Sequence, residues 1–172
     1  MDFDLGAYQS LFNLIHVLAV MAFILTHGLS GLMALRIRGE RDRARIQTMV
    51  QLSSSFLVWG WLALAVLFVA GVLAGIAGGW WTGGRLWIWA SLGVFVGVTI
   101  LMTPIASSYM EAVRHGVGLP SLADQRRKQV APEPASDEEL ERILGSSKPI
   151  WAAMIGVAGI VVLTWLMMSK PL

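Results

Sequence analysis

The sequence contains no cysteine, and charged residues make up only 14% of its 172 positions. The absence of cysteine excludes disulfides, thiolate-bound iron–sulfur clusters and thiol catalysis within this chain. The low charge, with a hydrophobic fraction of 56% and a mean hydropathy of +0.66, excludes an ordinary soluble globular domain. Such a composition indicates a protein that is surrounded by lipid.

Long segments without charge predict transmembrane helices. A bilayer core of about 30 Å takes roughly 20 apolar residues in helical form, because backbone groups in lipid must form hydrogen bonds within the segment. Four segments are long enough, at about residues 8–35, 52–77, 86–110 and 150–168. We therefore predict an all-α integral membrane protein, folded as a four-transmembrane-helix bundle in a single membrane domain, 1–172.

Basic residues gather in two loops, and this predicts the orientation. Loops rich in Lys and Arg resist translocation and stay on the cytoplasmic side. The first loop carries Arg36, Arg38, Arg41, Arg43 and Arg45. The second, residues 111–149, is also basic, so we expect both termini on the outer side of a bacterial cytoplasmic membrane. The five arginines, with Trp80 and Trp81 near the outer ends, are expected to contact lipid headgroups. Nucleic acid is not needed to explain the pI of 9.4.

The second loop contains the pattern of a short helix. Ser136 followed by Glu139 forms a capping box, in which each residue satisfies a backbone amide of the other. Leu140, Ile143 and Leu144 then share one helical face before Gly145 ends the helix. A short helix is therefore predicted over 137–144, either lying on the membrane surface or a partner, or simply shortening the linker.

His16 and His27 are the only ionisable side chains inside the predicted spans. Eleven residues make three helical turns, so both imidazoles point the same way, about 16 Å apart along the axis. Intramembrane histidines are candidate haem b ligands, and metal binding or proton handling is a further alternative. The structural alternative is a hydrogen bond to a hydroxyl on a neighbouring helix, for which the candidates are Ser53, Ser54, Thr99 and Thr103.

The chain offers few further ligands for a haem or for copper. A six-coordinate haem needs a second axial ligand, and the third histidine, His115, lies beyond the third predicted span. Met21, Met102 or a histidine of a second copy could serve as that ligand, or the iron could stay five-coordinate. The nine methionines are dispersed, which is typical of core packing rather than of a copper path. No carboxylate pair, nucleophile with a base or phosphate loop is present, so we do not expect an enzyme acting alone.

Several apolar motifs resemble known membrane proteins. The motifs are Leu14 to Ala19, Thr26 to Gly28, Gly79 to Trp81 and Leu86 to Trp89, together with the arginine-rich loop. They resemble a group of small bacterial predicted integral membrane proteins of unknown function, some of them distantly like copper-resistance D proteins. The resemblance covers about residues 11–118 and implies membrane copper transport that involves His16. This chain is shorter than the copper-resistance D proteins and has few other metal ligands.

These observations favour a non-catalytic subunit of a larger bacterial membrane complex, associated with electron transfer. Its expected partners are membrane lipid and other membrane protein subunits or a second copy of the chain. Small residues at four-residue spacing on the predicted helices, such as Gly93 and Gly97, suit such packing. The alternatives are a haem b protein that uses His16 and His27, and a copper-handling or small-solute transporter.

Overall fold

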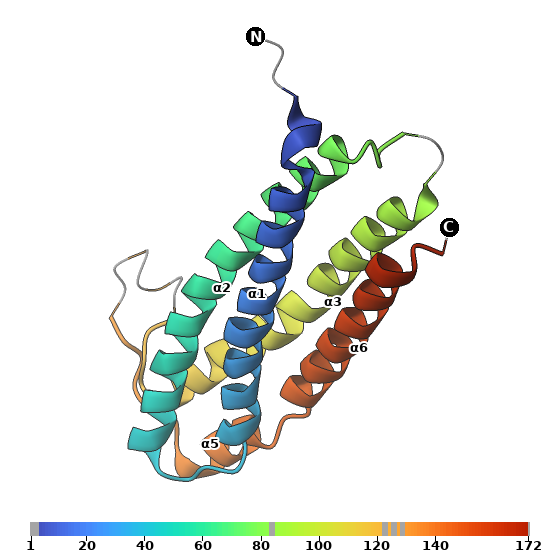
Figure 1. Cartoon of the computed structure of the whole chain (residues 1–172). Helices are drawn as coiled ribbons and strands as arrows, with labels where there is room; N and C mark the ends of the chain where they lie inside the picture. The colour runs from blue at the N-terminus through green and yellow to red at the C-terminus, as the bar shows by residue number, and fades with distance from the viewer. Residues whose placement is uncertain (1–3, 83–84, 122–123, 125–126, 128–129, 172) are drawn as a thin grey trace.

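The chain folds into helices, and four of them are long and apolar enough to cross a membrane. The computed structural model describes residues 4–82, 85–121, 124, 127 and 130–171, and no strand occurs among them. A short 3-10 helix, Leu5–Tyr8, is followed by α1 (Gln9–Ile37), α2 (Arg43–Ala77), α3 (Leu86–Gly116), α5 (Asp137–Leu144) and α6 (Lys148–Ser169) (Figure 1). The predicted all-helical, multi-pass membrane architecture is confirmed. The side on which the termini lie stays a prediction.

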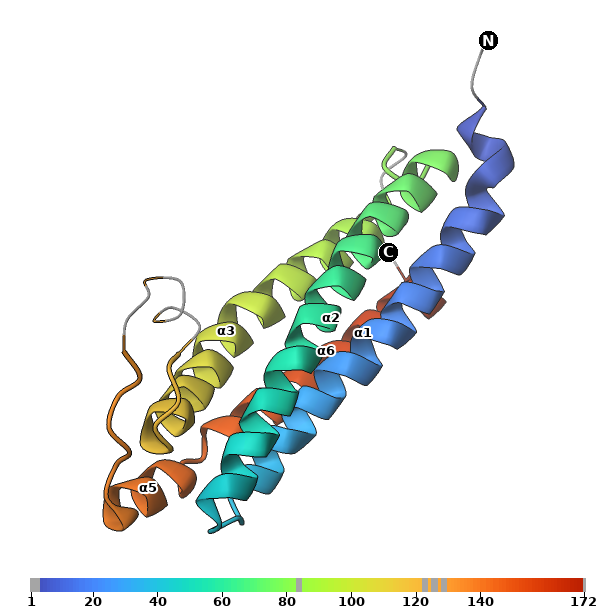
Figure 2. The same ribbon diagram turned by 90° about the vertical axis from the view of Figure 1, so that its left-hand side faces the viewer.

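The long helices form two antiparallel hairpins. Helix α1 packs along α2, α3 packs along α6, and contacts between the two hairpins are far fewer (Figures 1 and 2). Helix α1 begins and α6 ends at the end of the bundle opposite α5. We call the end that holds the 38–42 loop and α5 the basic end. The opposite end, which holds Trp80, Trp81, Trp87 and Trp89, is the tryptophan end.

Small residues bring the helices of each hairpin into close contact. Between α1 and α2, the hydroxyl oxygens of Ser30 and Ser53 lie 2.7 Å apart, and a Cβ added at Gly60 would lie 3.4 Å from Thr26 Oγ1. Between α3 and α6, a Cβ added at Gly159 would lie 2.7 Å from the Val98 side chain. In lipid, burial of apolar surface gives little driving force, so this close van der Waals packing holds the helices together.

The main buried core lies at the basic end and joins both hairpins to α5. Its fully buried members include Ile46 and Val50 from α2, Val113 from α3, and Leu140 and Leu144 from α5. Ser136 caps α5 as predicted, because its hydroxyl accepts a hydrogen bond from the Glu139 amide at 3.3 Å. The short helix thus buries its apolar stripe against the chain itself. It does not present this stripe to the membrane or to a partner.

Helix α2 begins at Arg43, well before the span predicted from residue 52. The Asp42 carboxylate caps it by accepting hydrogen bonds from the Ala44 and Arg45 amides. The added turns bury Ile46 and Val50 in the basic-end core. Hydropathy locates the part of a helix that lies in lipid, and it misses the part that continues into the headgroup region.

Aromatic rings join three elements at the tryptophan end. The rings of Trp80 and Trp87 lie 5.7 Å apart, and those of Trp81 and Trp89 lie 5.5 Å apart. The Lys170 ammonium lies 4.9 Å from the Trp80 ring centre and 5.5 Å from that of Trp87, in cation–π geometry. The end of α6 is thereby held against the turn between α2 and α3.

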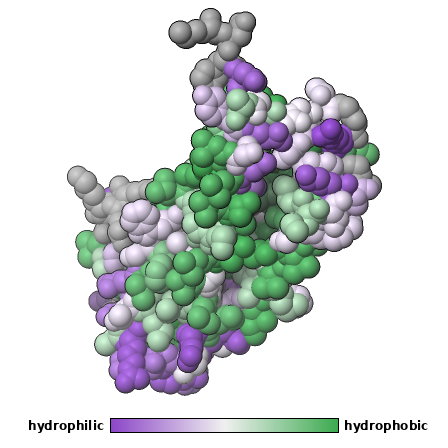
Figure 3. Space-filling view, in the orientation of Figure 1, coloured by the Kyte–Doolittle hydropathy of each residue, from purple (hydrophilic) through white to green (hydrophobic). Residues whose placement is uncertain are grey.

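The lateral surface of the bundle is apolar. Within the most apolar window of each long helix, only 11–17% of the residues are buried inside the chain. Hydrophobic residues cover the middle of the face seen in Figure 3, and hydrophilic residues gather towards the two ends. This surface suits a hydrocarbon solvent or membrane-embedded partners.

Candidate functional site

His16 takes part in the packing of α1 against α2. Its Nδ1 lies 2.9 Å from the backbone carbonyl oxygen of Leu67, and because a carbonyl only accepts, Nδ1 donates. Gly71 provides the space, since a Cβ at that position would lie 2.8 Å from His16 Cε1. His16 therefore bonds to a backbone carbonyl and not to a hydroxyl, which was the partner named in the structural alternative.

Three of the four candidate hydroxyl partners, Ser53, Ser54 and Thr99, have other contacts. Ser53 pairs with Ser30, and the Ser54 hydroxyl donates to the Val50 carbonyl at 2.9 Å. The Thr99 hydroxyl donates to the Phe95 carbonyl one turn earlier, at 2.8 Å. Ser54 and Thr99 satisfy their hydroxyls within their own helices, so such residues do not by themselves predict contacts between helices.

His27 differs from His16 in its surroundings. Its imidazole is half-buried and stacks on the Phe23 ring of the same helix, with centres 5.0 Å apart and planes 12° from parallel. No hydrogen bond joins the imidazole to any residue that the structure describes. A Cβ added at Gly28 or Gly31 would meet no atom within 4 Å, so the helix surface beside His27 is open. Of the two intramembrane histidines, His27 is the one available to a ligand.

The structure does not bring the three histidines to one point. His16 and His27 are about 16 Å apart along one helix, too far to bind one iron together. His115 lies at the end of α3, with its Nε2 2.8 Å from a carboxylate oxygen of Asp124. Among the described residues, no group of three or more His, Cys, Asp or Glu is placed to hold a metal ion. A haem or metal at either intramembrane histidine would need ligands from elsewhere.

Asp124 is the centre of a small polar cluster after α3. Its carboxylate accepts hydrogen bonds from the Ser121 backbone amide and from His115, each at 2.8 Å. Hydrogen bonds from the Ser121 side chain and then from His115 lower the pKa of Asp124 from 3.8 to about 2. The carboxylate is therefore charged at neutral pH and holds the loop against the end of the helix.

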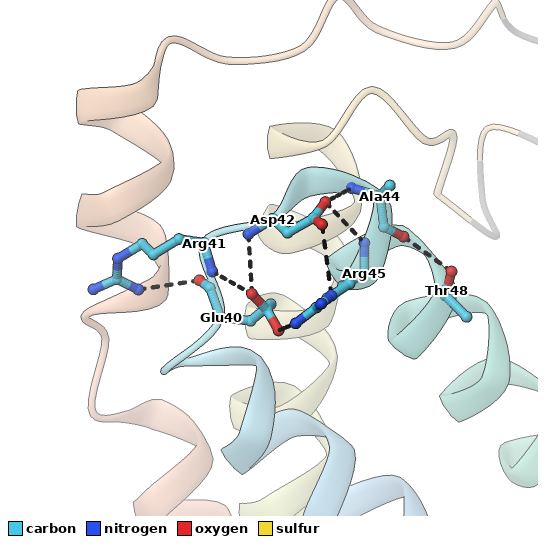
Figure 4. A network of polar contacts seen from close by, with 6 residues as sticks. All are labelled: Glu40, Arg41, Asp42, Ala44, Arg45 and Thr48. Atoms are coloured by element: carbon cyan, nitrogen blue, oxygen red, sulfur yellow. Dashed lines mark hydrogen bonds and ion pairs between the residues drawn. The ribbon is translucent and has the colours of Figure 1, made fainter.

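Most arginines of the first loop bind the chain itself. Arg38 Nε donates to the Ser146 carbonyl at 3.0 Å, and Arg41 pairs with Glu141 of α5 at 3.4 Å. The Arg43 guanidinium donates to three acceptors, which are the Gly116 and Ala135 carbonyls and the Asp137 carboxylate. Arg45 pairs with Glu40 and Asp42 in the network of Figure 4. These side chains, expected at lipid headgroups, tie the first loop together and to the α5 segment.

Arg36 is the exception among the loop arginines. It lies in the last turn of α1, between Leu35 and the buried Ile37, and it is exposed. No hydrogen bond or ion pair joins it to any described residue. It lines a surface hollow of about 320 Å³ together with Leu35, Gly39, Glu40 and Met49.

Arg114 joins the hairpins near the basic end. It is 7% exposed; its Nε donates to the Pro120 carbonyl at 2.9 Å and one terminal nitrogen donates to the Ser54 hydroxyl at 2.8 Å. No described carboxylate pairs with it. From the sequence, Arg114 was expected in the basic loop 111–149. Composition does not show which arginine of that segment is buried.

Trp59 and Trp61 are two exposed tryptophans of α2 that the sequence analysis did not single out. Their exposed fractions are 62% and 60%. Between them, Gly60 is buried against Thr26 of α1, so the two indoles lie on opposite flanks of the first hairpin. A sequence signal existed, because tryptophan in the middle of an apolar span lies away from its preferred place at the membrane interface.

Comparison with known proteins identifies no relative: no protein-family model, no curated protein and no solved structure matches the chain.

Proposed function

We propose that this chain is a non-catalytic integral membrane subunit of a larger membrane complex, and that Trp59 and Trp61 contact its partner within the bilayer. The supporting observation is the exposure of both indoles at the depth of the apolar core. Trp59 lies eight residues after Gln51, or about 12 Å along the helix, inside a hydrocarbon layer of about 30 Å. Lipid tails offer an indole N–H no acceptor, whereas protein interfaces are enriched in tryptophan.

The orientation proposal rests on the charge distribution. The basic end carries the arginines of the first loop, and positive loops remain on the cytoplasmic side. Both termini then face outward from a bacterial cytoplasmic membrane. Four of the five loop arginines bind within the chain, but their charge still opposes translocation during insertion, so their internal contacts do not weaken this argument.

Co-purification from a mild detergent tests the subunit role. We expect the wild-type chain to retain a membrane protein partner at fixed stoichiometry, and a double variant, Trp59→Leu with Trp61→Leu, to lose it. Trp165→Leu is the matched control, because this tryptophan is 55% exposed and lies in the other hairpin. Retention of the partner by the double variant, or equal loss in the control, would contradict the proposal.

A haem b protein is the second candidate, and the surroundings of His27 favour it. Its imidazole has no described hydrogen-bond partner, and Gly28 and Gly31 leave open helix surface beside it. Haem would supply one-electron chemistry, and His27 would supply one axial ligand. The association with electron transfer rests on this histidine.

A reduced-minus-oxidised spectrum with Soret and α bands, lost in His27→Ala and kept in His115→Ala, is the expected result for haem. A spectrum without these bands eliminates it.

A further inference from the structure

The hollow beside Arg36 has the features of a small-ligand site at the membrane boundary. It is a shallow, open depression with a volume of about 320 Å³. Leu35 and Met49 give it apolar walls, and Arg36 and Glu40 give it one cation and one anion. It lies where the apolar part of α1 meets the first basic residue.

Arg36 is the arginine of the first loop whose side chain has no partner among the described residues. The side chains of Arg38, Arg41, Arg43 and Arg45 each make a hydrogen bond or ion pair to another described residue, and the side chain of Arg36 makes none. A guanidinium presents several N–H donors in a plane that matches the oxygens of a phosphate. Arg36 therefore suits a phosphate group.

Glu40 sets the charge of the other side of the hollow. Its carboxylate accepts hydrogen bonds from the Arg41 and Asp42 backbone amides, at 2.8 and 3.0 Å, as Figure 4 shows. These bonds, that of Asp42 first, lower the pKa of Glu40 below its ordinary value, so the group is ionised at neutral pH. Its second oxygen lies 3.8 Å from a terminal nitrogen of Arg45, a long ion pair whose arginine is 70% exposed.

We propose that this hollow binds the headgroup of an amino-phospholipid of the phosphatidylethanolamine type. The phosphate lies against Arg36, the primary ammonium against the Glu40 carboxylate, and the glycerol and upper acyl chain against Leu35 and Met49. One cation, one anion and an apolar wall match the three parts of such a lipid. This site is separate from Trp59 and Trp61, so a test of lipid binding here is independent of the test for a protein partner.

Native mass spectrometry of the full chain with added lipids tests the assignment. We expect one phosphatidylethanolamine to bind more tightly than phosphatidylglycerol, which lacks the amine, and than phosphatidylcholine, whose quaternary ammonium has no N–H to donate. Arg36→Gln should weaken this binding about tenfold, the effect of losing a charge-assisted hydrogen bond. Arg142→Gln is the control, with the same change in charge on α5, outside the hollow.

Two further measurements separate the parts of the proposal. Glu40→Gln keeps the backbone hydrogen bonds but removes the charge, so it should abolish the preference over phosphatidylglycerol. Water-soluble glycerophosphoethanolamine should bind much more weakly than the whole lipid. Equal binding of all three lipids, equal weakening by Arg142→Gln, or equal binding of the soluble headgroup would overturn the assignment. An unchanged melting temperature of Arg36→Gln shows that any loss is local.

Discussion

His16 Nδ1 lies 2.9 Å from the Leu67 carbonyl oxygen, a hydrogen bond between two membrane helices that depends on the absence of a side chain at Gly71. The first hairpin thus satisfies an imidazole with a backbone group. It places a glycine opposite the ring so that the helices can approach. The same relation of a polar side chain to a small residue recurs where Thr26 meets Gly60.

Gly71→Ala should destabilise the protein. The new Cβ would lie 2.8 Å from His16 Cε1, so the ring must move away from the Leu67 carbonyl. Overpacking of this kind lowers the free energy of unfolding by about 1–3 kcal/mol. Gly93→Ala is the control: its Cβ meets no atom within 4 Å, and alanine favours a helix by about 0.5–1 kcal/mol. Unfolding in mixed detergent micelles measures both, and equal effects would show that His16 does not constrain the packing.

Tyr109→Phe should stabilise the protein. Tyr109 is 1% exposed in the basic-end core, and its hydroxyl has no hydrogen-bond partner among the described residues. An unsatisfied buried hydroxyl costs about 1–3 kcal/mol, so its removal should raise the free energy of unfolding by about 1 kcal/mol. Val113→Ala, at a fully buried neighbour in the same core, should instead lower it. A loss of stability in Tyr109→Phe would mean that the hydroxyl has a partner, such as a bound water.

Arg114→Met should weaken the junction between the hairpins. The substitution keeps much of the apolar stem but removes the donors to Ser54 and Pro120. Hydrogen bonds from charged groups contribute about 1.5–3 kcal/mol, so we expect the free energy of unfolding to fall by about 2 kcal/mol. Arg142→Met, which breaks an exposed pair with Glu139, should change stability little. A similar small effect at both positions would show that the buried arginine does not hold the hairpins together.

Acidification should release the loop that follows α3. Folding lowers the pKa of Asp124 from 3.8 to about 2, so its contribution to stability is complete above pH about 4 and disappears as the pH falls through 2. The Asp124→Asn variant should lack this pH-dependent contribution to stability. The measurement is the difference in melting temperature between wild type and variant, which should shrink from pH 5 to pH 2. A constant difference would contradict the depressed pKa.

Much of the architecture follows from the sequence alone. The four apolar segments predict the four long helices, since hydropathy reports directly which residues tolerate lipid. The ends are less predictable: α2 extends back to Arg43 because Asp42 caps it and the basic-end core takes up Ile46 and Val50. Hydropathy carries no information on such contacts.

The candidate site was only partly predictable. The sequence identified His16 and His27 as the intramembrane ionisable groups on one face of a helix. It did not show that His16 is hydrogen-bonded to Leu67, whereas His27 has no described hydrogen-bond partner. It identified the arginines of the first loop by charge, but it could not show which of them bind within the chain. Arg36 was expected at lipid headgroups together with the other four arginines, and it was distinguished from them only when the partners of residues such as Arg38 and Arg43 were known.

Photo-crosslinking inside the native membrane tests the central claim most directly. A photo-reactive phenylalanine analogue at position 61 should form an adduct of defined mass with one membrane protein. The same analogue at position 161, where Val161 is 62% exposed on the other hairpin, should react with lipid alone. An absence of protein adducts at position 61, or the same adducts from both positions, would contradict the account of α2 as the surface that binds a partner.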